Sequence, residues 1–177
     1  MTPGEIHSEH PFVPPPAERD PIRRFRGRLV APVTIVTAGR PERRTGLTIS
    51  SLVVAEGEPG RLFFLVGPAT DLFAAIEETG RFAVHVAGRE HRQLADRFAG
   101  TRPSPGGLFA GLDYTDGVWG PLLAGFGTTA LCRLETVTET AYHMLVEAVV
   151  EHLEVHELAE PLAYFRGSYR RLHDPGD

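Results

Sequence analysis

The sequence predicts a mainly β protein, an antiparallel barrel with a few short helices attached. About seven segments are rich in β-branched residues or alternate between apolar and polar side chains, as strands do. Two other segments have the helical period, and the two patterns do not alternate along the chain as parallel βαβ units require. The chain has 177 residues, of which 42% are hydrophobic and 23% charged, so it can form one globular domain.

The predicted strands are short, and turn residues such as Gly39 and Pro41 separate them. They cover residues 29–38, 46–55, 61–67, 81–87, 128–139 and 141–155, with shorter ones at 162–165 and 169–172. Because short turns join the first three, we expect those strands to pair in order as an antiparallel meander. In the strand at 81–87, Phe82 and Val84 share one face and His85 lies on the other, so His85 is expected opposite the core.

Two short helices are predicted, at residues 70–79 and 90–98. Thr70 can cap the start of the first helix, and Gly80 can end it. Residues 22–28 can add one or two helical turns with a basic face. The stretch that follows the second helix, residues 101–120, holds five Gly and two Pro, so we expect a long loop there.

The domain organisation is a tail followed by one folded unit. Residues 1–21 are rich in Pro and show little apolar periodicity, so they cannot bury enough surface to offset their ordering entropy. We interpret them as a tail that can reach over a partner subunit. The folded domain is expected to cover residues 22–174.

Composition excludes several classes of function. A net charge of −5 argues against nucleic-acid binding. All 18 basic residues are Arg, so mechanisms that need a lysine are excluded. The single cysteine, Cys132, cannot form an intrachain disulfide. The sequence shows neither a signal peptide nor an apolar run long enough to span a membrane, so we expect a cytoplasmic protein that does not bind membranes.

Two further motifs are weak. Residues 125–130 match the dinucleotide fingerprint G-x-G-x-x-A, but the segment that follows alternates like a strand instead of starting a helix. His152 and His156 are four residues apart among several glutamates, in a stretch that also reads as a strand. A solvated edge is the favoured interpretation over a zinc site, and no metal is predicted.

A hydroxyl-rich strand is the most informative segment. Thr48, Ser50 and Ser51 lie close together after Gly46, and clustered hydroxyls beside exposed backbone N–H groups suit a phosphate or a ribityl chain. A polar strand face would explain the same pattern equally well.

This segment belongs to an ordered series of motifs. The series consists of PVTIVTAG at 32–39, TGLTISSL at 45–52, the helix from Thr70, GRFAVHVA at 80–87, LADRFAG at 94–100 and PLAYFRGSYRRL at 161–172. In this order and spacing, over about residues 25–172, the series resembles the flavin reductase family. The resemblance implies the FMN-binding split-barrel fold, an antiparallel split β-barrel.

The resemblance also implies roles for individual residues. The hydroxyl-rich segment would contact the flavin ribityl and phosphate through Thr48, Ser50 and Ser51. Thr70 matches a position where the family commonly has a phosphate-binding Ser. The other matching positions are His85 beside the isoalloxazine, the F-A-G motif at Phe98, Ala99 and Gly100, and His143 as the His of a G-D-H motif, in the nicotinamide pocket.

The sequence departs from the family pattern at two places. The Gly and Asp that precede the family's His are Ala141 and Tyr142 here. The family's S-x-S-x-x-P-P turn corresponds to residues 54–60, where both Ser are lost and Glu56 adds a carboxylate. A carboxylate is unfavourable beside a flavin phosphate, so either Glu56 turns outward or the flavin is held differently.

The leading functional hypothesis is an NAD(P)H-dependent flavin reductase that transfers hydride to FMN or FAD. The reduced flavin could be supplied to a partner monooxygenase. One alternative is a split-barrel flavoprotein without reductase turnover, which stores flavin or binds a partner. Another is a flavoenzyme with a specific small-molecule substrate. We expect a homodimer, because an isolated small split barrel leaves strand edges open and related proteins form the flavin site between two subunits.

Overall fold

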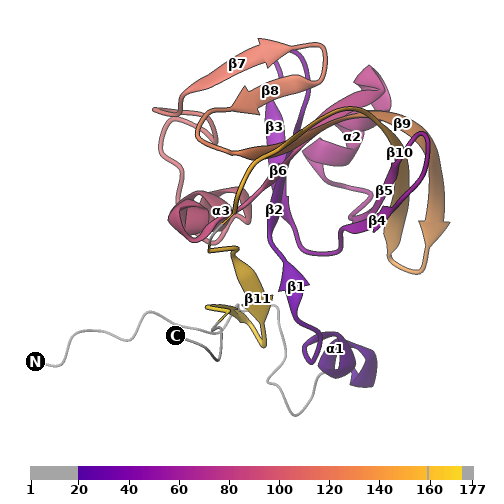
Figure 1. The fold of residues 1–177 in the computed structure, drawn as a ribbon, viewed down its shortest axis with the longest axis vertical. Coiled ribbons are helices and arrows are strands. Elements are labelled where there is room, and N and C mark those ends of the chain that lie inside the picture. Colours follow the sequence, from indigo (N-terminus) through magenta and orange to yellow (C-terminus); the bar gives the residue numbers. More distant parts are fainter. Residues whose placement is uncertain (1–19, 159, 173–177) are drawn as a thin grey trace, which may run out of the picture.

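The computed structural model describes residues 20–158 and 160–172, so the predicted tail lies almost entirely outside the described residues. Figure 1 shows a curled antiparallel sheet with helices α2 and α3 on different sides of it and α1 near the β1 end. The strand order in the seven-stranded sheet is β3-β2-β6-β9-β10-β5-β4. The prediction of a mainly β, antiparallel split barrel is confirmed, and the barrel is not closed.

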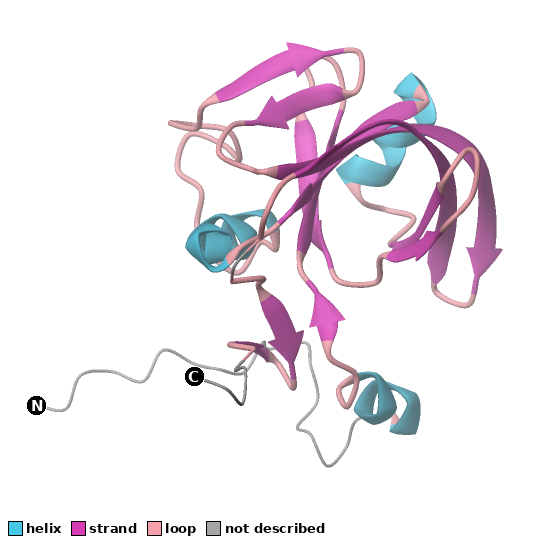
Figure 2. Cartoon of the chain, viewed as in Figure 1, coloured by secondary structure: helices cyan, strands magenta, loops and turns pink. Residues whose placement is uncertain are grey.

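The elements follow the predicted order closely. The helices are α1 (Pro21–Arg26), α2 (Asp71–Thr79), the short η1 (Arg89–His91) and α3 (Arg92–Phe98). The strands are β1 (Ala31–Pro32), β2 (Thr34–Ala38), β3 (Thr45–Ile49), β4 (Val53–Ala55), β5 (Arg61–Val66), β6 (Arg81–Val86), β7 (Tyr114–Gly117), β8 (Gly120–Leu123), β9 (Thr128–Thr140), β10 (His143–Val155), β11 (Ala163–Phe165) and β12 (Ser168–Arg170). Figure 2 shows how strands dominate the fold.

The predicted pairing of the first three segments is confirmed, but they do not form a continuous meander. The expected strand at 46–55 is interrupted between Ile49 and Val53, and its two halves lie at opposite edges of the seven-stranded sheet. β3 pairs with β2, and β4 pairs with β5. The alternation of apolar and polar residues cannot reveal this interruption. A chain that crosses between the two edges of a curled sheet keeps the same alternation on both sides of the crossing.

The remaining differences are smaller. The strand expected at 29–38 is divided at Val33 into β1 and β2, and β1 pairs with β11 in a separate three-stranded sheet. Residues 101–120 are not only a loop, because β7 begins there and pairs with β8 as a hairpin.

The main core lies inside the curled sheet. Helix α2 packs into its opening with Leu72 and Ile76, at 1% and 0% exposure, against buried side chains of β2, β5 and β6. The Thr70 hydroxyl accepts the Phe73 N–H at the start of α2, and Gly80 ends the helix at φ +66°. Both predicted helix ends are therefore confirmed.

A second layer covers the outer face of β6. Ile35, Phe98 and Leu123 form a separate buried cluster there, to which α3 and the 101–127 segment contribute. His85 does point away from the main core, but this layer covers it completely, to 0% exposure. The expectation that His85 lies opposite the main core is confirmed, and its complete cover comes from segments that are remote in sequence.

His85 joins the two layers through both ring nitrogens. Nδ1 lies 3.1 Å from the Ile35 carbonyl oxygen, and Nε2 lies 3.1 Å from the Leu123 backbone nitrogen. A carbonyl can only accept, so Nδ1 carries the proton and Nε2 accepts the Leu123 N–H. Burial lowers the pKa of His85 to about 4, which keeps the ring neutral.

The β9–β10 hairpin contains a strained residue. Thr140 pairs with His143, so Ala141 and Tyr142 form a two-residue turn. Ala141 has φ +51°, a region where a side chain is unfavourable and Gly is preferred. This is the position at which the resembled family has the Gly of its G-D-H motif, a residue that would adopt this φ without strain.

Protonation of His85 should cost stability in a defined pH window. The unfolded side chain titrates near 6.5 and the folded one near 4, so the unfolded state binds the proton more strongly between these values. The stability present above pH 6.5 is lost as the pH falls towards 4, by about 3 kcal/mol. Urea unfolding of His85→Gln at several pH values should give a lower free energy of unfolding, and this free energy should depend less on pH than in the unmodified protein. If the free energy of unfolding of His85→Gln still falls with pH as steeply as that of the exposed control His156→Gln, the prediction is wrong.

The turn strain can be tested by Ala141→Gly. We expect this change to raise the free energy of unfolding by about 1 kcal/mol, because Gly adopts φ +51° without a steric penalty. Ala74→Gly, at an exposed position of α2, should instead lower it by about 1 kcal/mol. Chemical denaturation measures both. If both variants lose stability alike, the turn is not strained.

Candidate functional site

A pocket of about 470 Å³ lies where α1, β3, α3 and the β11–β12 hairpin meet. Its volume is in the range of small-molecule sites. Both polar and aromatic side chains line it: Arg26, Val33, Thr48, Ser50, Arg92, Asp96, Ala99, Thr101, Tyr164, Gly167, Ser168 and Tyr169. Below, this is called the polar pocket.

Three of the predicted flavin-binding residues line the polar pocket, namely Thr48, Ser50 and Ala99. The Thr48 hydroxyl donates to the Ala95 carbonyl over 2.6 Å, which fixes α3 against β3. The Ser50 hydroxyl forms no hydrogen bond with any other described residue, so it can serve a ligand. The structure therefore brings together residues that are far apart in the sequence.

Two other predicted hydroxyls lie at the end of β5. Ser51 Oγ accepts the Leu65 N–H over 3.0 Å and lies 3.2 Å from the Leu65 carbonyl oxygen, to which it can donate. The Thr70 hydroxyl donates to the Gly67 carbonyl over 2.8 Å while it caps α2. Both groups have structural partners, and neither lines the polar pocket.

The buried members of the predicted set have packing roles. Phe98 is 1% exposed, and its ring meets the Phe109 ring edge to face at 5.4 Å. His85 is enclosed with both nitrogens bonded to backbone groups, so its ring offers no free atom to a flavin. Gly100, at φ +69°, follows Ala99 but is not part of the pocket lining.

His143 lies at the start of β10, away from the polar pocket lining. It is half-buried, and its neighbour Met144 pairs with Val66 near the end of β5. It therefore belongs to the same end of the sheet as Ser51 and Thr70. Glu56, the carboxylate in the segment that departs from the family turn, is exposed and does not line the pocket. This agrees with the alternative in which Glu56 turns outward.

Sequence reasoning missed the charged and aromatic side of the polar pocket. The Arg92 guanidinium lies over the Tyr169 ring, 5.6 Å from its centroid. Burial, and then the Asp96 carboxylate, raise the pKa of Tyr169 above its usual range, so the phenol stays protonated. The only available signal was the aromatic, arginine-rich run at 164–171, because Arg26 and Arg92 join it through tertiary contacts alone.

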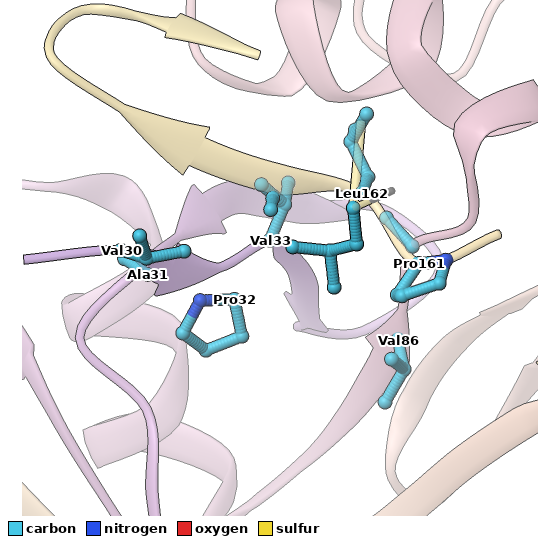
Figure 3. Close-up of a pocket in the computed structure, with 10 residues that line it drawn as sticks. Val30, Ala31, Pro32, Val33, Val86, Pro161 and Leu162 are labelled. Carbon is cyan, nitrogen blue, oxygen red and sulfur yellow. The ribbon is translucent and has the colours of Figure 1, made fainter. Parts of the chain in front are cut away.

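A second pocket, of about 250 Å³, lies beside the first and shares Val33 with it. Figure 3 shows Val30, Pro32, Val86 and Leu162 around this space, which is lined by apolar residues from β1, the end of β6 and the segment before β11. It offers contact area but no polar group that could orient a ligand. The polar pocket is therefore the better candidate site.

The weaker motifs have structural roles in the described part of the chain. Residues 125–130 lead into β9, which begins at Thr128, so they start a strand and not a helix. The His152 ring packs edge to face on Trp119 at 5.0 Å. Within residues 20–158 and 160–172, no three His, Cys, Asp or Glu side chains are grouped as a metal site. No helix in these ranges is long and apolar enough to cross a membrane.

Cys132 is an inert core residue. It is fully buried, and burial followed by the nearby Glu151 carboxylate raises the pKa of its thiol to about 12. Its thiolate is therefore not formed at neutral pH, and thiolate chemistry has no place in the site.

Comparisons with known proteins show which proteins this chain is similar to. The chain is 28% identical over 156 residues to the 4-hydroxyphenylacetate 3-monooxygenase reductase component of Pseudomonas aeruginosa, covering 87% of this chain and 92% of the relative. It is 32% identical over 160 residues to the NADH-dependent FMN reductase AsuE2 of Streptomyces nodosus subsp. asukaensis, covering 89% and 86%.

Solved structures agree with these relatives. The NADH:FAD oxidoreductase SgcE6 of Streptomyces globisporus C-1027 superposes with a TM-score of 0.78 at 26% identity, over 90% of this chain and 100% of that one. A flavin reductase domain protein from Arthrobacter sp. FB24 gives 0.78 at 25% identity, over 86% and 94%. The family model described as "Flavin reductase like domain" matches residues 26–173. As the sequence motifs predicted, the chain belongs to the flavin reductase family.

Proposed function

We propose that this protein is an NADH-using flavin reductase that binds the flavin ring system in the polar pocket and supplies reduced flavin to a separate monooxygenase. The observation that carries the location is that Thr48, Ser50 and Ala99, from two separate segments, line one pocket. Relatives named as NADH-dependent reductases and as monooxygenase reductase components support the activity, and they favour it over a flavin-storage protein.

The residues of the polar pocket fit a flavin. Val33 and the Tyr164 ring offer flat apolar contacts, while the Ser50 and Thr101 hydroxyls and backbone groups near Gly167 can orient polar edges. A bound flavin would accept hydride from NADH and pass the electrons on. The protein then needs to position two ring systems, which requires no acid or base and agrees with a pocket that contains no catalytic dyad.

We place the phosphate end of the flavin towards Ser51 and Thr70. The peptide between Ser50 and Ser51 leads from the polar pocket to the end of β5, where Thr70 begins α2. A helix start provides N–H groups that favour a phosphate. FMN and FAD both remain candidates, because the relatives include an FMN reductase and an NADH:FAD oxidoreductase.

We further propose a homodimer in the cytoplasm, where NADH is available, with residues 22–174 as the folded unit. The sheet ends in two edge strands, β3 and β4, and Val53 and Val54 on β4 are each 61% exposed. Pairing of open edges and burial of such apolar side chains both favour association of two copies. Light scattering, which gives the mass in solution, tests this assembly.

Ser50→Ala should weaken flavin binding by about 1 to 3 kcal/mol, because a ligand would lose its hydrogen bond with a hydroxyl that serves no other described residue. Fluorescence titration of FMN and FAD measures the loss, and the melting temperature should stay unchanged. Ser51→Ala should lower flavin affinity and stability together, because its hydroxyl also bridges to Leu65. Unchanged titrations for both variants would move the flavin elsewhere.

His143→Ala should slow flavin reduction by NADH while flavin affinity stays within about twofold, if the side chain positions the nicotinamide. Stopped-flow absorbance separates reduction from binding. His152→Ala, which removes an exposed His farther along the same strand, is the matched control. A normal reduction rate would end the proposed role, and a large loss of stability would identify His143 as a packing residue.

A further inference from the structure

The polar pocket has a cationic wall that the family resemblance did not indicate. Arg26 reaches it from α1, and Arg92 reaches it from the start of α3. Arg23, Arg24 and Arg28 lie on or next to α1, and Arg166 and Arg170 lie in the β11–β12 hairpin. This end of the molecule is therefore rich in arginine, although the chain as a whole carries a net charge of −5.

The two lining arginines are available to a ligand. Arg89 and Arg171, nearby, share the Glu160 carboxylate at 3.2 and 2.7 Å. In contrast, neither Arg26 nor Arg92 forms an ion pair within the described part of the chain. Because both arginines line the polar pocket and neither has a carboxylate partner there, their positive charge would attract a bound anion.

The one acidic residue of the lining does not neutralise Arg92. Asp96 lies one helical turn after Arg92, yet its carboxylate raises the pKa of the Tyr169 phenol and lies 3.5 Å from the Thr101 hydroxyl. Arg92 instead stacks over the Tyr169 ring. Stacking fixes the plane of a guanidinium while leaving its N–H groups free, which suits forked hydrogen bonding to phosphate.

We propose that Arg26 and Arg92 form an anion subsite that binds a phosphate group of a nucleotide entering the polar pocket. This inference rests on the proposed function only for the identity of the nucleotide. The phosphate can belong to the adenylate half of FAD or to the nicotinamide dinucleotide, because the phosphate next to the flavin ribityl chain is placed towards Ser51 and Thr70. The chemistry of recognition is the same in each case, and a panel of ligands separates them.

The test compares Arg26→Gln and Arg92→Gln with two matched controls in the full chain. Arg23→Gln removes the same charge from the same helix, and Arg170→Gln removes it from the C-terminal hairpin, and neither control lines the pocket. Each variant is titrated with riboflavin, FMN and FAD, and its KM is measured for NADH and NADPH. Thermal melting confirms that each variant is folded.

We expect at least one phosphate-bearing ligand to bind about tenfold more weakly in both lining variants, because a charge-assisted hydrogen bond is lost. Riboflavin, which has no phosphate, should change by less than twofold, and the controls should match the unmodified protein. Loss with FMN and FAD alike would show that the arginines bind the flavin phosphate itself and would overturn its placement at Ser51 and Thr70. Loss with FAD alone identifies its adenylate half, and a raised KM alone identifies the nicotinamide dinucleotide.

Two results would overturn the proposal. One is an equal loss for riboflavin, FMN and FAD, because it would show that the arginines only shape the pocket. The other is a set of affinities and KM values that match those of Arg23→Gln and Arg170→Gln. If the proposed flavin location is wrong, the result is different from both. Ser50→Ala would then leave flavin binding unchanged, whatever the arginine variants do.

Discussion

The crossing of the chain from one edge of the sheet to the other, at residues 50–52, is the constraint on which the site depends. Because β3 and β4 lie at opposite edges, the segment between them must bridge the opening of the curled sheet. Ser51 makes this possible by satisfying both backbone groups of Leu65 on β5. The crossing leaves Ser50 facing the polar pocket on one side and leads to the start of α2 on the other.

Helix α3 is held in place by contacts that also explain why Gly46 is needed. A Cβ atom at Gly46 would lie 2.6 Å from the Phe98 ring, so only glycine lets that ring pack against β3. Thr48 fixes the same helix through the Ala95 carbonyl. The residues that α3 presents to the pocket, Arg92, Asp96 and Ala99, therefore depend on two small positions in β3.

Two histidines extend this support. His85 accepts the Leu123 N–H, and the His91 ring stacks on Phe126 with centroids 3.8 Å apart. His91 also accepts the Gly88 N–H through Nδ1 and lies with Nε2 3.1 Å from the Gly125 carbonyl oxygen, so Nε2 carries the proton. A neutral imidazole offers one donor and one acceptor in a fixed plane. Here that property ties the 123–126 segment to the start of α3.

The sequence predicted those parts of the fold whose cause is local. The alternation of 81–87, the Thr70 cap and the Gly80 stop all act within one turn or one strand, and each is present in the structure. The partner of a strand and the cover over His85 depend on residues tens of positions away, so periodicity could not reveal them. The same reason explains why the sequence predicted Thr48 and Ser50 as candidate site residues but gave no indication of Arg26 and Arg92. Hydroxyls cluster along one strand, whereas Arg26 and Arg92 meet only after folding.

The β9–β10 turn departs from the family pattern at Ala141 and Tyr142, and the two changes have different physical effects. The backbone at Ala141 has a positive φ that glycine would adopt freely, so the turn that leads to His143 at the start of β10 forms at a cost in strain. What changes is the side chain at the tip, because Tyr142 is 90% exposed where the family has a carboxylate. If His143 contacts a nicotinamide, it does so without an acidic neighbour in the turn.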